Sequence, residues 1–317
     1  MSAPLSPPPG AVDGQLLSGT SLVVRLANFV KLPHTVFAMP FALVGMLFAS
    51  VRSPLTPPLV LWVVVAFTSA RFAAMAFNRL VDRDVDALNP RTAQRELPAG
   101  TLTVGQARAS IAVMSLLFVV AAWQLNPLCL ALAPIALGWV LGYSFTKRFT
   151  RWSHLWLGLG LSIAPVGGYL AITGAWSEPW WLLCLLALGV GCWTGGFDVL
   201  YSLQDADFDR HHGLHSLPAA LGVTGAIRIS RLLHGVAVAC FAGVMLAAPL
   251  GPQVPGAATA LLWLAVVGAA VMLIWEHRLV KADDLSRIDA AFFTMNGIIS
   301  LGFFAAVLAA RLLVNRA

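Results

Sequence analysis

The stretch FNRLVDRDVDALNPRTAQRELPAG, residues 77–100, places three aspartates, Asp82, Asp84 and Asp86, at alternate positions directly after an apolar run. Acidic residues are scarce in this chain, which has only 14 Asp and Glu among its 317 residues. Such a concentration of negative charge beside a hydrophobic segment requires a physical reason.

The composition indicates an integral membrane protein. Hydrophobic residues make up 59% of the chain, charged residues make up 11%, and the mean hydropathy is +0.81. Soluble domains average about 45–50% apolar and about 25% charged residues. Runs of about 20 apolar residues span a bilayer as helices, and a helix pairs its own backbone groups in lipid. We predict an all-α integral membrane protein with nine transmembrane helices in one bundle, at 33–50, 58–80, 104–124, 127–146, 154–174, 180–203, 228–250, 257–276 and 290–312.

The chain divides into a tail and one membrane domain. Residues 1–20 are rich in Pro, Gly and Ser and lack the basic segment of a signal peptide, so we expect a disordered N-terminal tail. Residues 21–317 form the predicted membrane domain, in which LVVRLANFVK at 22–31 has the character of an interfacial segment.

Lys and Arg gather in alternate connections between the predicted spans, which indicates orientation because cytoplasmic loops are enriched in basic residues. This bias places the N-terminus and the motif-bearing connections in the cytoplasm, and nine spans then place the C-terminus outside. The net charge of +6 reflects mainly this asymmetry. A basic surface for nucleic acid is the weaker interpretation, and we expect no nucleic-acid partner.

The aspartate pattern occurs a second time in FDVLYSLQDADFDRHHGLHSLPAALG, residues 197–222, where Asp205, Asp207 and Asp209 repeat the spacing. Each copy ends a predicted helix and is followed by the tripeptide LPA. The copies lie four predicted spans apart, so both reach the same side of the membrane. This pattern predicts an internal repeat of about four helices.

Spacing along a helix suggests a metal site. Residues four apart are neighbours, so Asp82 meets Asp86 and Asp205 meets Asp209, whereas Asp84 and Asp207 point away. Like charges so close repel unless a cation lies between them, and carboxylates with a phosphate suit Mg²⁺. Solvated loops whose acids balance nearby arginines are the alternative, which the two matched copies disfavour. The predicted Mg²⁺ ligands are Asn78, Asp82, Asp86, Asp205 and Asp209.

This combination of motifs resembles the UbiA superfamily of intramembrane prenyltransferases. The similarity covers nearly the whole chain and includes the pattern YxxxK at Tyr143 and Lys147, and Asp198 three residues before Tyr201. Residues 31–45 and 78–100 are most similar to the bacterial 4-hydroxybenzoate polyprenyltransferase-like branch, part of which is thought to serve menaquinone synthesis.

The resemblance implies a Mg²⁺-dependent transfer of a polyprenyl group from polyprenyl diphosphate to an aromatic acid. The acceptor would be 4-hydroxybenzoate or a dihydroxynaphthoate, in ubiquinone or menaquinone synthesis at the cytoplasmic face of the bacterial inner membrane. Cationic side chains would neutralise the leaving diphosphate. The expected contacts for the diphosphate are Lys147, Tyr143, Arg79, Arg83 and Arg210.

Two ionisable residues lie deeper in the predicted spans and are functional candidates for that reason. Arg71 precedes Asn78 by one heptad and Asp198 precedes Asp205 by the same interval, so both face the cavity above the metal site. Arg71 would bind an aromatic carboxylate or the diphosphate, and Asp198 would orient the acceptor or take up its proton. A salt bridge between the two is the alternative.

A transporter and a prenyltransferase with a different acceptor are the alternative functions. A cation-coupled transporter also carries intramembrane acids, but its site usually lies at mid-membrane on broken helices. Within the superfamily, haem, homogentisate or a chlorophyllide would be other acceptors. His154, His234 and His277 fall near predicted membrane ends, where we expect half-polar interfacial rings.

Overall fold

The computed structural model describes residues 19, 21–31, 35–247, 249–251, 253–288 and 290–314, without the side chains of 35–37 and 290–291. Within these ranges the regular secondary structure is helical, apart from one isolated β-bridge between Lys281 and Asp284. The predicted tail at 1–20 falls almost wholly outside the described residues.

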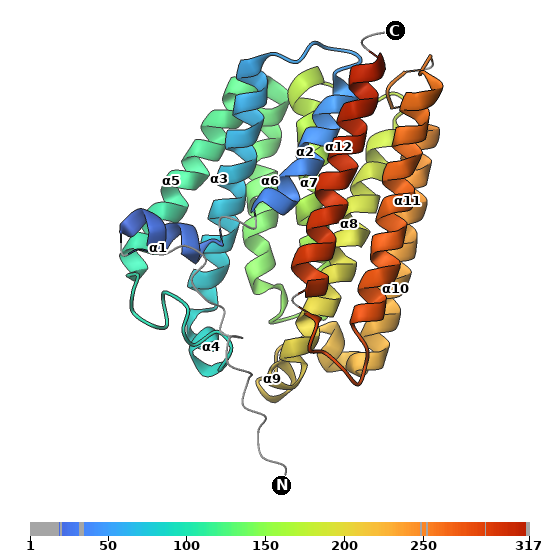
Figure 1. Cartoon of the computed structure of the whole chain (residues 1–317). Helices are drawn as coiled ribbons and strands as arrows, with labels where there is room; N and C mark the ends of the chain where they lie inside the picture. Colours follow the sequence, from blue (N-terminus) through green and yellow to red (C-terminus); the bar gives the residue numbers. More distant parts are fainter. Residues whose placement is uncertain are drawn as a thin grey trace.

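The long helices run side by side as one bundle (Figure 1). Short α1 (Leu22–Phe29) lies crosswise to them, while α4 (Arg83–Leu88) and α9 (Ala206–His211) lie at the lower end. The long helices are α2 (Thr35–Ala49), α3 (Pro57–Val81), α5 (Val104–Leu125), α6 (Pro127–Thr146), α7 (Ser153–Thr173), α8 (Trp181–Tyr201), α10 (Leu217–Leu246), α11 (Gly256–Leu279) and α12 (Asn296–Val314).

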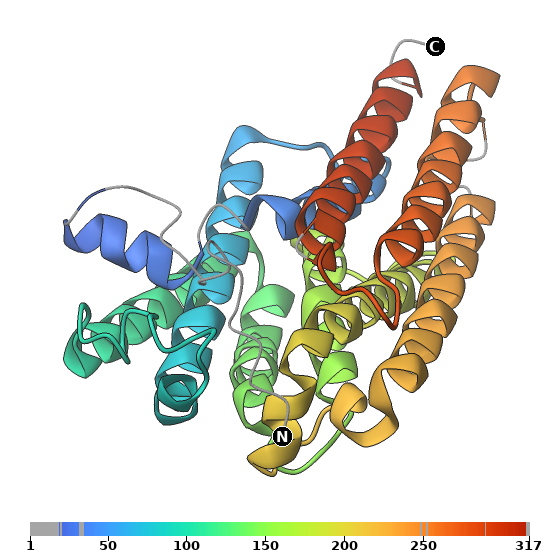
Figure 2. The same ribbon diagram turned by 60° about the horizontal axis from the view of Figure 1, so that its bottom comes forward.

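Helices that follow one another in the chain are neighbours in the bundle, and α12 returns to pack against α2 (Figure 2). Eight of the described helical segments have the length and hydropathy to cross a membrane. The exception among the long helices is α2, whose 15 residues fall short of the roughly 20 needed. The class of fold is confirmed, whereas the count of nine spans stays a prediction.

Helix α10 begins earlier than the hydropathy pattern predicts, at Leu217 rather than residue 228. The Ser216 hydroxyl caps it by accepting a hydrogen bond from the Ala219 N–H at 3.3 Å, and Pro218 occupies the first turn, where its missing N–H does no harm. Gly222 then kinks the helix with φ 69° and ψ 173°. Hydropathy detects only the apolar part beyond this kink.

Both aspartate motifs lie where a long helix breaks and a six-residue helix begins. Asp82 stands between α3 and α4, and Asp205 stands between the 3₁₀ turn η2 (Ser202–Asp205) and α9. Their backbone angles are nearly the same, φ −92° and ψ 3° against φ −100° and ψ 1°. Aspartate is a favoured N-cap residue, yet neither side chain makes a capping hydrogen bond. Their carboxylates remain available for other partners.

Helix α7 holds the bundle together through direct backbone contacts with its neighbours. A Cβ added to Gly168 would overlap the carbonyl oxygen of Ala42 in α2, and one added to Gly158 would overlap that of Gly191 in α8. Small residues allow this close approach, which drives helix association in lipid. The glycines of α7 therefore fix α2 and α8 around the site.

Adjacent glycines in α7 allow a matched test of this packing. Gly168→Ala should destabilise the protein by about 1–3 kcal/mol, because the methyl group has to displace the backbone of α2. Gly167→Ala should be neutral, because no neighbouring atom lies within 4 Å of its added Cβ. Apparent thermal midpoints in one detergent compare the two variants, and equal midpoints would contradict this account of the packing.

Candidate active site

A polar cavity of about 300 Å³ lies at the lower end of the bundle. It is lined by the ends of α3, α6 and α8, by α4 and α9, and by the turn that precedes α12. Parts of the chain that are far apart in sequence thus meet here. All five predicted metal ligands line this cavity: Asn78, Asp82, Asp86, Asp205 and Asp209.

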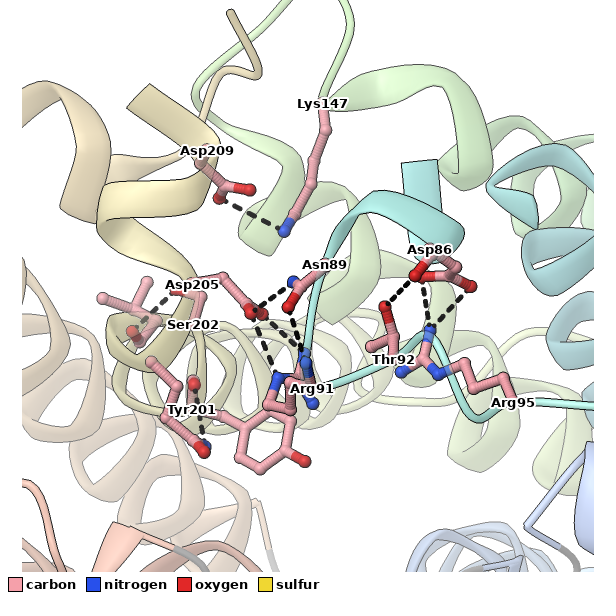
Figure 3. A network of polar contacts seen from close by, with 12 residues as sticks. Asp86, Asn89, Arg91, Thr92, Arg95, Lys147, Tyr201, Ser202, Asp205 and Asp209 are labelled. Carbon is pink, nitrogen blue, oxygen red and sulfur yellow. Dashed lines mark hydrogen bonds and ion pairs between the residues drawn. The ribbon is translucent and has the colours of Figure 1, made fainter. Parts of the chain in front are cut away.

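Each of the four motif carboxylates lies beside a basic side chain, and Figure 3 shows three of the pairs. Asp86, Asp205 and Asp209 are buried. Acids and bases therefore alternate around the cavity instead of forming two bare carboxylate pairs. The pairs are Asp82–Arg148 at 3.6 Å, Asp86–Arg95 at 2.9 Å, Asp205–Arg91 at 2.7 Å and Asp209–Lys147 at 3.4 Å.

Arg91 joins the first motif segment to the second. Its Nε and Nη2 donate to the two carboxylate oxygens of Asp205 at 3.1 and 2.7 Å, and the Asn89 amide donates to the same group at 3.1 Å. Such two-pronged pairs are among the strongest protein hydrogen bonds. Burial acts to lower the pKa of Arg91, but the Asp205 carboxylate outweighs it, so the pKa is raised.

Arg95 makes the equivalent contact within the first segment. Its Nη1 donates to both oxygens of Asp86, at 2.9 and 3.0 Å, and the Thr92 hydroxyl donates to the Asp86 backbone carbonyl at 3.0 Å. The chain after α4 thus folds back over the motif. Arg91 and Arg95 stand four residues apart in the sequence but bind aspartates of different motifs, Asp205 and Asp86.

The environment of Asp82 disfavours its charged form. Its pKa is raised to about 6, first by burial and then by the charge of Asp86, although Lys147 and Arg148 act in the opposite direction. Asn78 donates a hydrogen bond to Asp82 at 2.9 Å. Among the residues that the structure describes, no three His, Cys, Asp or Glu side chains form a ready metal-binding group.

The remaining motif residues lie outside this network. Asp84 and Asp207 are 84% and 86% exposed, as the helical spacing predicts, and they pair with Arg83 and Arg210. Neither of these arginines, both predicted as diphosphate contacts, lines the polar cavity. Arg79 does line it, but its Nη1 lies 2.7 Å from Glu96 and the side chain is only 4% exposed.

Asp198 lines the cavity and is held by His154, a contact that the sequence did not reveal. His154 Nδ1 lies 2.7 Å from the carboxylate, and its Nε2 accepts the Leu217 N–H at 3.4 Å. A ring that accepts at Nε2 carries its proton at Nδ1, so His154 donates to Asp198. His154 is fully buried, contrary to the expected interfacial ring, because it lines the cavity at the start of α7 and contacts Asp198 of α8 and Leu217 of α10.

A second, apolar cavity of about 550 Å³ adjoins the first. It lies among α2, α3, α5, α6 and α7, with alanine and glycine along much of its lining. Arg71, Asn78 and Tyr143 line both cavities, so the two spaces meet at these side chains. The arrangement offers a polar chamber at the membrane surface that continues into an apolar one.

The fold and these cavities define a multi-pass helical membrane protein with an acid-lined chamber at one end. The profile of the UbiA prenyltransferase family matches residues 38–298, and the chain belongs to this family. It is therefore a prenyltransferase.

Curated relatives carry a more specific name. The 4-hydroxybenzoate octaprenyltransferase of Shewanella woodyi is 29% identical over 221 residues, covering 69% of this chain and 75% of the relative. That of Shewanella piezotolerans is 29% identical over 274 residues, covering 86% and 91%.

Solved structures share the fold. The apo structure of a UbiA homolog from Aeropyrum pernix K1 matches with a TM-score of 0.77 and 34% identity, covering 87% of this chain and 98% of that one. A UbiA homolog from Archaeoglobus fulgidus bound to GPP and Mg²⁺ matches with a TM-score of 0.71 and 17% identity, covering 90% and 99%.

The Arg79–Glu96 pair generates a stability prediction. Arg79→Gln or Glu96→Gln should each lower stability by about 3–5 kcal/mol, because each leaves a buried charge without its partner. Arg83→Gln, which breaks an exposed pair, should cost about 0–1 kcal/mol. Thermal midpoints in detergent measure both. A folded Arg79→Gln protein of normal stability would show instead that the Glu96 carboxylate does not need Arg79 as its partner.

Proposed function

We propose that this prenyltransferase moves a polyprenyl group from polyprenyl diphosphate to an aromatic acid in a Mg²⁺-dependent reaction. The observation that carries the proposal is the convergence of both aspartate motifs on one polar chamber that continues into an apolar cavity. A substrate with an anionic head and a long hydrocarbon tail matches this combination. A UbiA homolog of the same fold has been solved with GPP and Mg²⁺, which supports the choice of ligands.

The donor set suits the metal. Carboxylate and amide oxygens are hard ligands that hold Mg²⁺ together with phosphate oxygens. Asp82 and Asp205, whose side chains make no capping hydrogen bond, line the chamber. Bound Mg²⁺ would supply positive charge for the diphosphate and stabilise it as a leaving group. Asn78, Asp86 and Asp209 would complete the ligand set.

We expect the basic side chains beside the motif carboxylates to bind the diphosphate as well. Arg91, Arg95 and Lys147 each donate a hydrogen bond to a motif carboxylate, and Arg148 forms an ion pair with Asp82 at 3.6 Å. If the carboxylates held Mg²⁺, the N–H groups of these bases could donate to the diphosphate oxygens. Charge-assisted hydrogen bonds of this kind stabilise the charge that grows as the C–O bond breaks.

The junction of the two cavities is the proposed position for the acceptor. Arg71 lines both spaces and would hold the acceptor carboxylate, while Asp198, fixed by His154, would take up the ring proton or orient the phenolic hydroxyl. The apolar cavity would hold the first part of the prenyl chain and exclude water. The curated relatives' name favours 4-hydroxybenzoate as acceptor, and a dihydroxynaphthoate is the second choice.

The proposed site faces the cytoplasm of a bacterial inner membrane. Its support is the positive-inside pattern: the connections rich in Lys and Arg lie at the same end of the bundle as α4 and α9 (Figure 1).

A transfer assay tests the function. Membranes containing the protein receive radiolabelled polyprenyl diphosphate with 4-hydroxybenzoate or a dihydroxynaphthoate, with Mg²⁺ or with EDTA. We expect lipid-soluble labelled product with at least one acceptor, and only with Mg²⁺. Haem, homogentisate and a chlorophyllide serve as alternative acceptors, and product formed with one of these alone would exclude an aromatic-acid substrate.

Substitution of the motif aspartates should distinguish the Mg²⁺ ligands from the aspartates that bind no metal. Asp82→Ala and Asp205→Ala should each reduce turnover at least about a hundredfold, the scale of a lost transition-state electrostatic contact. Asp84→Ala and Asp207→Ala should be mild, because these carboxylates point into solvent. Turnover at saturating Mg²⁺ measures all four. Folded Asp82 and Asp205 variants that retain more than about a third of activity would refute the metal-ligand assignment.

Arg71 should act on the acceptor. Arg71→Ala should raise the apparent KM for the aromatic acid and leave that for prenyl diphosphate nearly unchanged, because it removes a positioning contact with the carboxylate. Arg71→Lys should be intermediate, since it keeps the charge and loses the two-pronged geometry. An increase confined to prenyl diphosphate would reassign Arg71 to the diphosphate.

A further inference from the structure

Five aromatic rings line one side of the polar chamber and belong neither to the metal ligands nor to the acceptor contacts. They come from two places: Trp193, Phe197 and Tyr201 of α8, and Phe292 and Phe293 of the π-helical turn η3 (Ala290–Met295). The three α8 residues recur at every fourth position and so share one face of the helix. We call these five residues the aromatic wall.

Phe292 is the centre of the wall. Its ring centroid lies 5.2 Å from that of Phe197, 4.2 Å from Tyr201 and 4.7 Å from Phe293. Trp193 extends the row, with its centroid 5.2 Å from Phe197. Three of these four contacts are edge-to-face. The interplanar angle is 85° for Phe197–Phe292, 87° for Phe292–Phe293 and 77° for Trp193–Phe197. The rings therefore form one connected surface.

A buried polar network fixes this surface. The Trp193 indole N–H donates to the side-chain oxygen of Asn296 at 2.8 Å, and the Asn296 amide donates to the Phe292 carbonyl at 3.0 Å and to Glu276 at 3.4 Å. Asn296 and Glu276 are buried, so these bonds form in a low-dielectric interior, where they are strong. The Asn296 amide thus links Trp193, at one end of the wall, to the backbone of Phe292 at its centre.

The local backbone sets the wall apart from ordinary core packing. The turn η3 is π-helical, a rare form that occurs mostly as single turns at functional sites. It brings Phe292 and Phe293 to the chamber together. Trp193 and Phe197 also belong to the hydrophobic core that holds Phe41, Phe241 and Phe303, but the latter three rings line neither cavity.

The wall already faces one cation. The guanidinium carbon of Arg91 lies 5.7 Å from the centroid of the Tyr201 ring, within the range of a cation–π contact. Arg91 also binds Asp205, one of the motif carboxylates. A ring face of the wall is thus presented to positive charge directly beside the aspartate motif.

We propose that the aromatic wall stabilises the allylic carbocation formed during prenyl transfer and shields it from water. This inference rests on the proposed function. The bond from the prenyl carbon to the diphosphate oxygen breaks, and its electron pair leaves with the diphosphate. The positive charge then spreads over the allyl unit, which the electron-rich faces of the rings attract without offering a nucleophile.

The cation has two fates that an experiment distinguishes. In transfer, π electrons of the acceptor ring form the new carbon–carbon bond, and the ring proton leaves to a base. In hydrolysis, a water oxygen bonds to the same carbon and loses a proton, which yields a prenyl alcohol. A wall that both attracts the cation and excludes water favours the first fate over the second.

The test removes rings one at a time. Phe292→Leu removes a ring from the turn η3, and Phe197→Leu removes one from α8. If one variant fails to fold, the other still tests the proposal. Phe303→Leu is the matched control, because it removes a buried ring of α12 from the core and not from the chamber. Purified protein with Mg²⁺, polyprenyl diphosphate and the aromatic acid gives kcat, both KM values and the ratio of prenyl alcohol to prenylated acid.

We expect each wall variant to lower kcat about tenfold, the effect of one desolvated cation–ring contact, with both KM values little changed. The ratio of alcohol to product should rise severalfold, and Phe292→Tyr, which keeps a ring, should restore it. Phe303→Leu should leave the ratio unchanged. If the wild type is active and the wall variants match Phe303→Leu in kcat and in the ratio of alcohol to product, the proposed role of the aromatic wall is wrong. A wild-type protein that releases no diphosphate would overturn the proposed function and the wall together.

Discussion

The ion pair between Arg91 and Asp205 joins the two motif-bearing segments, and the chamber depends on it. Four carboxylates gathered at the helix ends would repel one another in a region of low dielectric. The structure resolves this by placing a base against each acid, with Arg91 and Asn89 reaching from one motif to the other. Helix α3 ends just before Asp82, and α8 ends at Tyr201, four residues before Asp205, so both motifs lie in short helical segments at the same end of the bundle.

The bundle supplies the rest of the geometry. Helix α7 contacts α2 and α8 backbone to backbone through glycines, so it sets the distance between the helices that flank the chamber. The same small residues leave the apolar cavity between α3, α6 and α7. Close packing and open space thus arise from one feature of the sequence, its frequent Gly and Ala.

The spans and the motif were predictable because they depend on local patterns. Hydropathy reports whether about 20 residues suit lipid, and helical spacing reports that Asp84 and Asp207 point away. The early start of α10 was missed because a Ser-Leu-Pro cap has no hydropathy signal. The span predicted at 33–50 corresponds to α2, for which the structure describes the 15 residues Thr35–Ala49.

The partners within the site were much harder to predict. Arg91 could be recognised as a cytoplasmic charge, but its partner Asp205 is 114 residues away, and nothing in the local sequence identifies it. His154 looked interfacial because it stands at the start of a span, whereas its burial follows from the packing of α8 and α10 over it. In the aromatic wall, the spacing along α8 was visible, but the π-helical turn that brings Phe292 into place was not.

The long sequence separation within the chamber has a consequence for biogenesis. Chains are made from the N-terminus, so Arg79 meets Glu96 after only 17 more residues, whereas Arg91 emerges long before Asp205 exists. The first half therefore reaches the membrane with its motif charges only partly matched. The site is complete only after α8, α9 and the turn before α12 have been made, because each contributes side chains to the chamber.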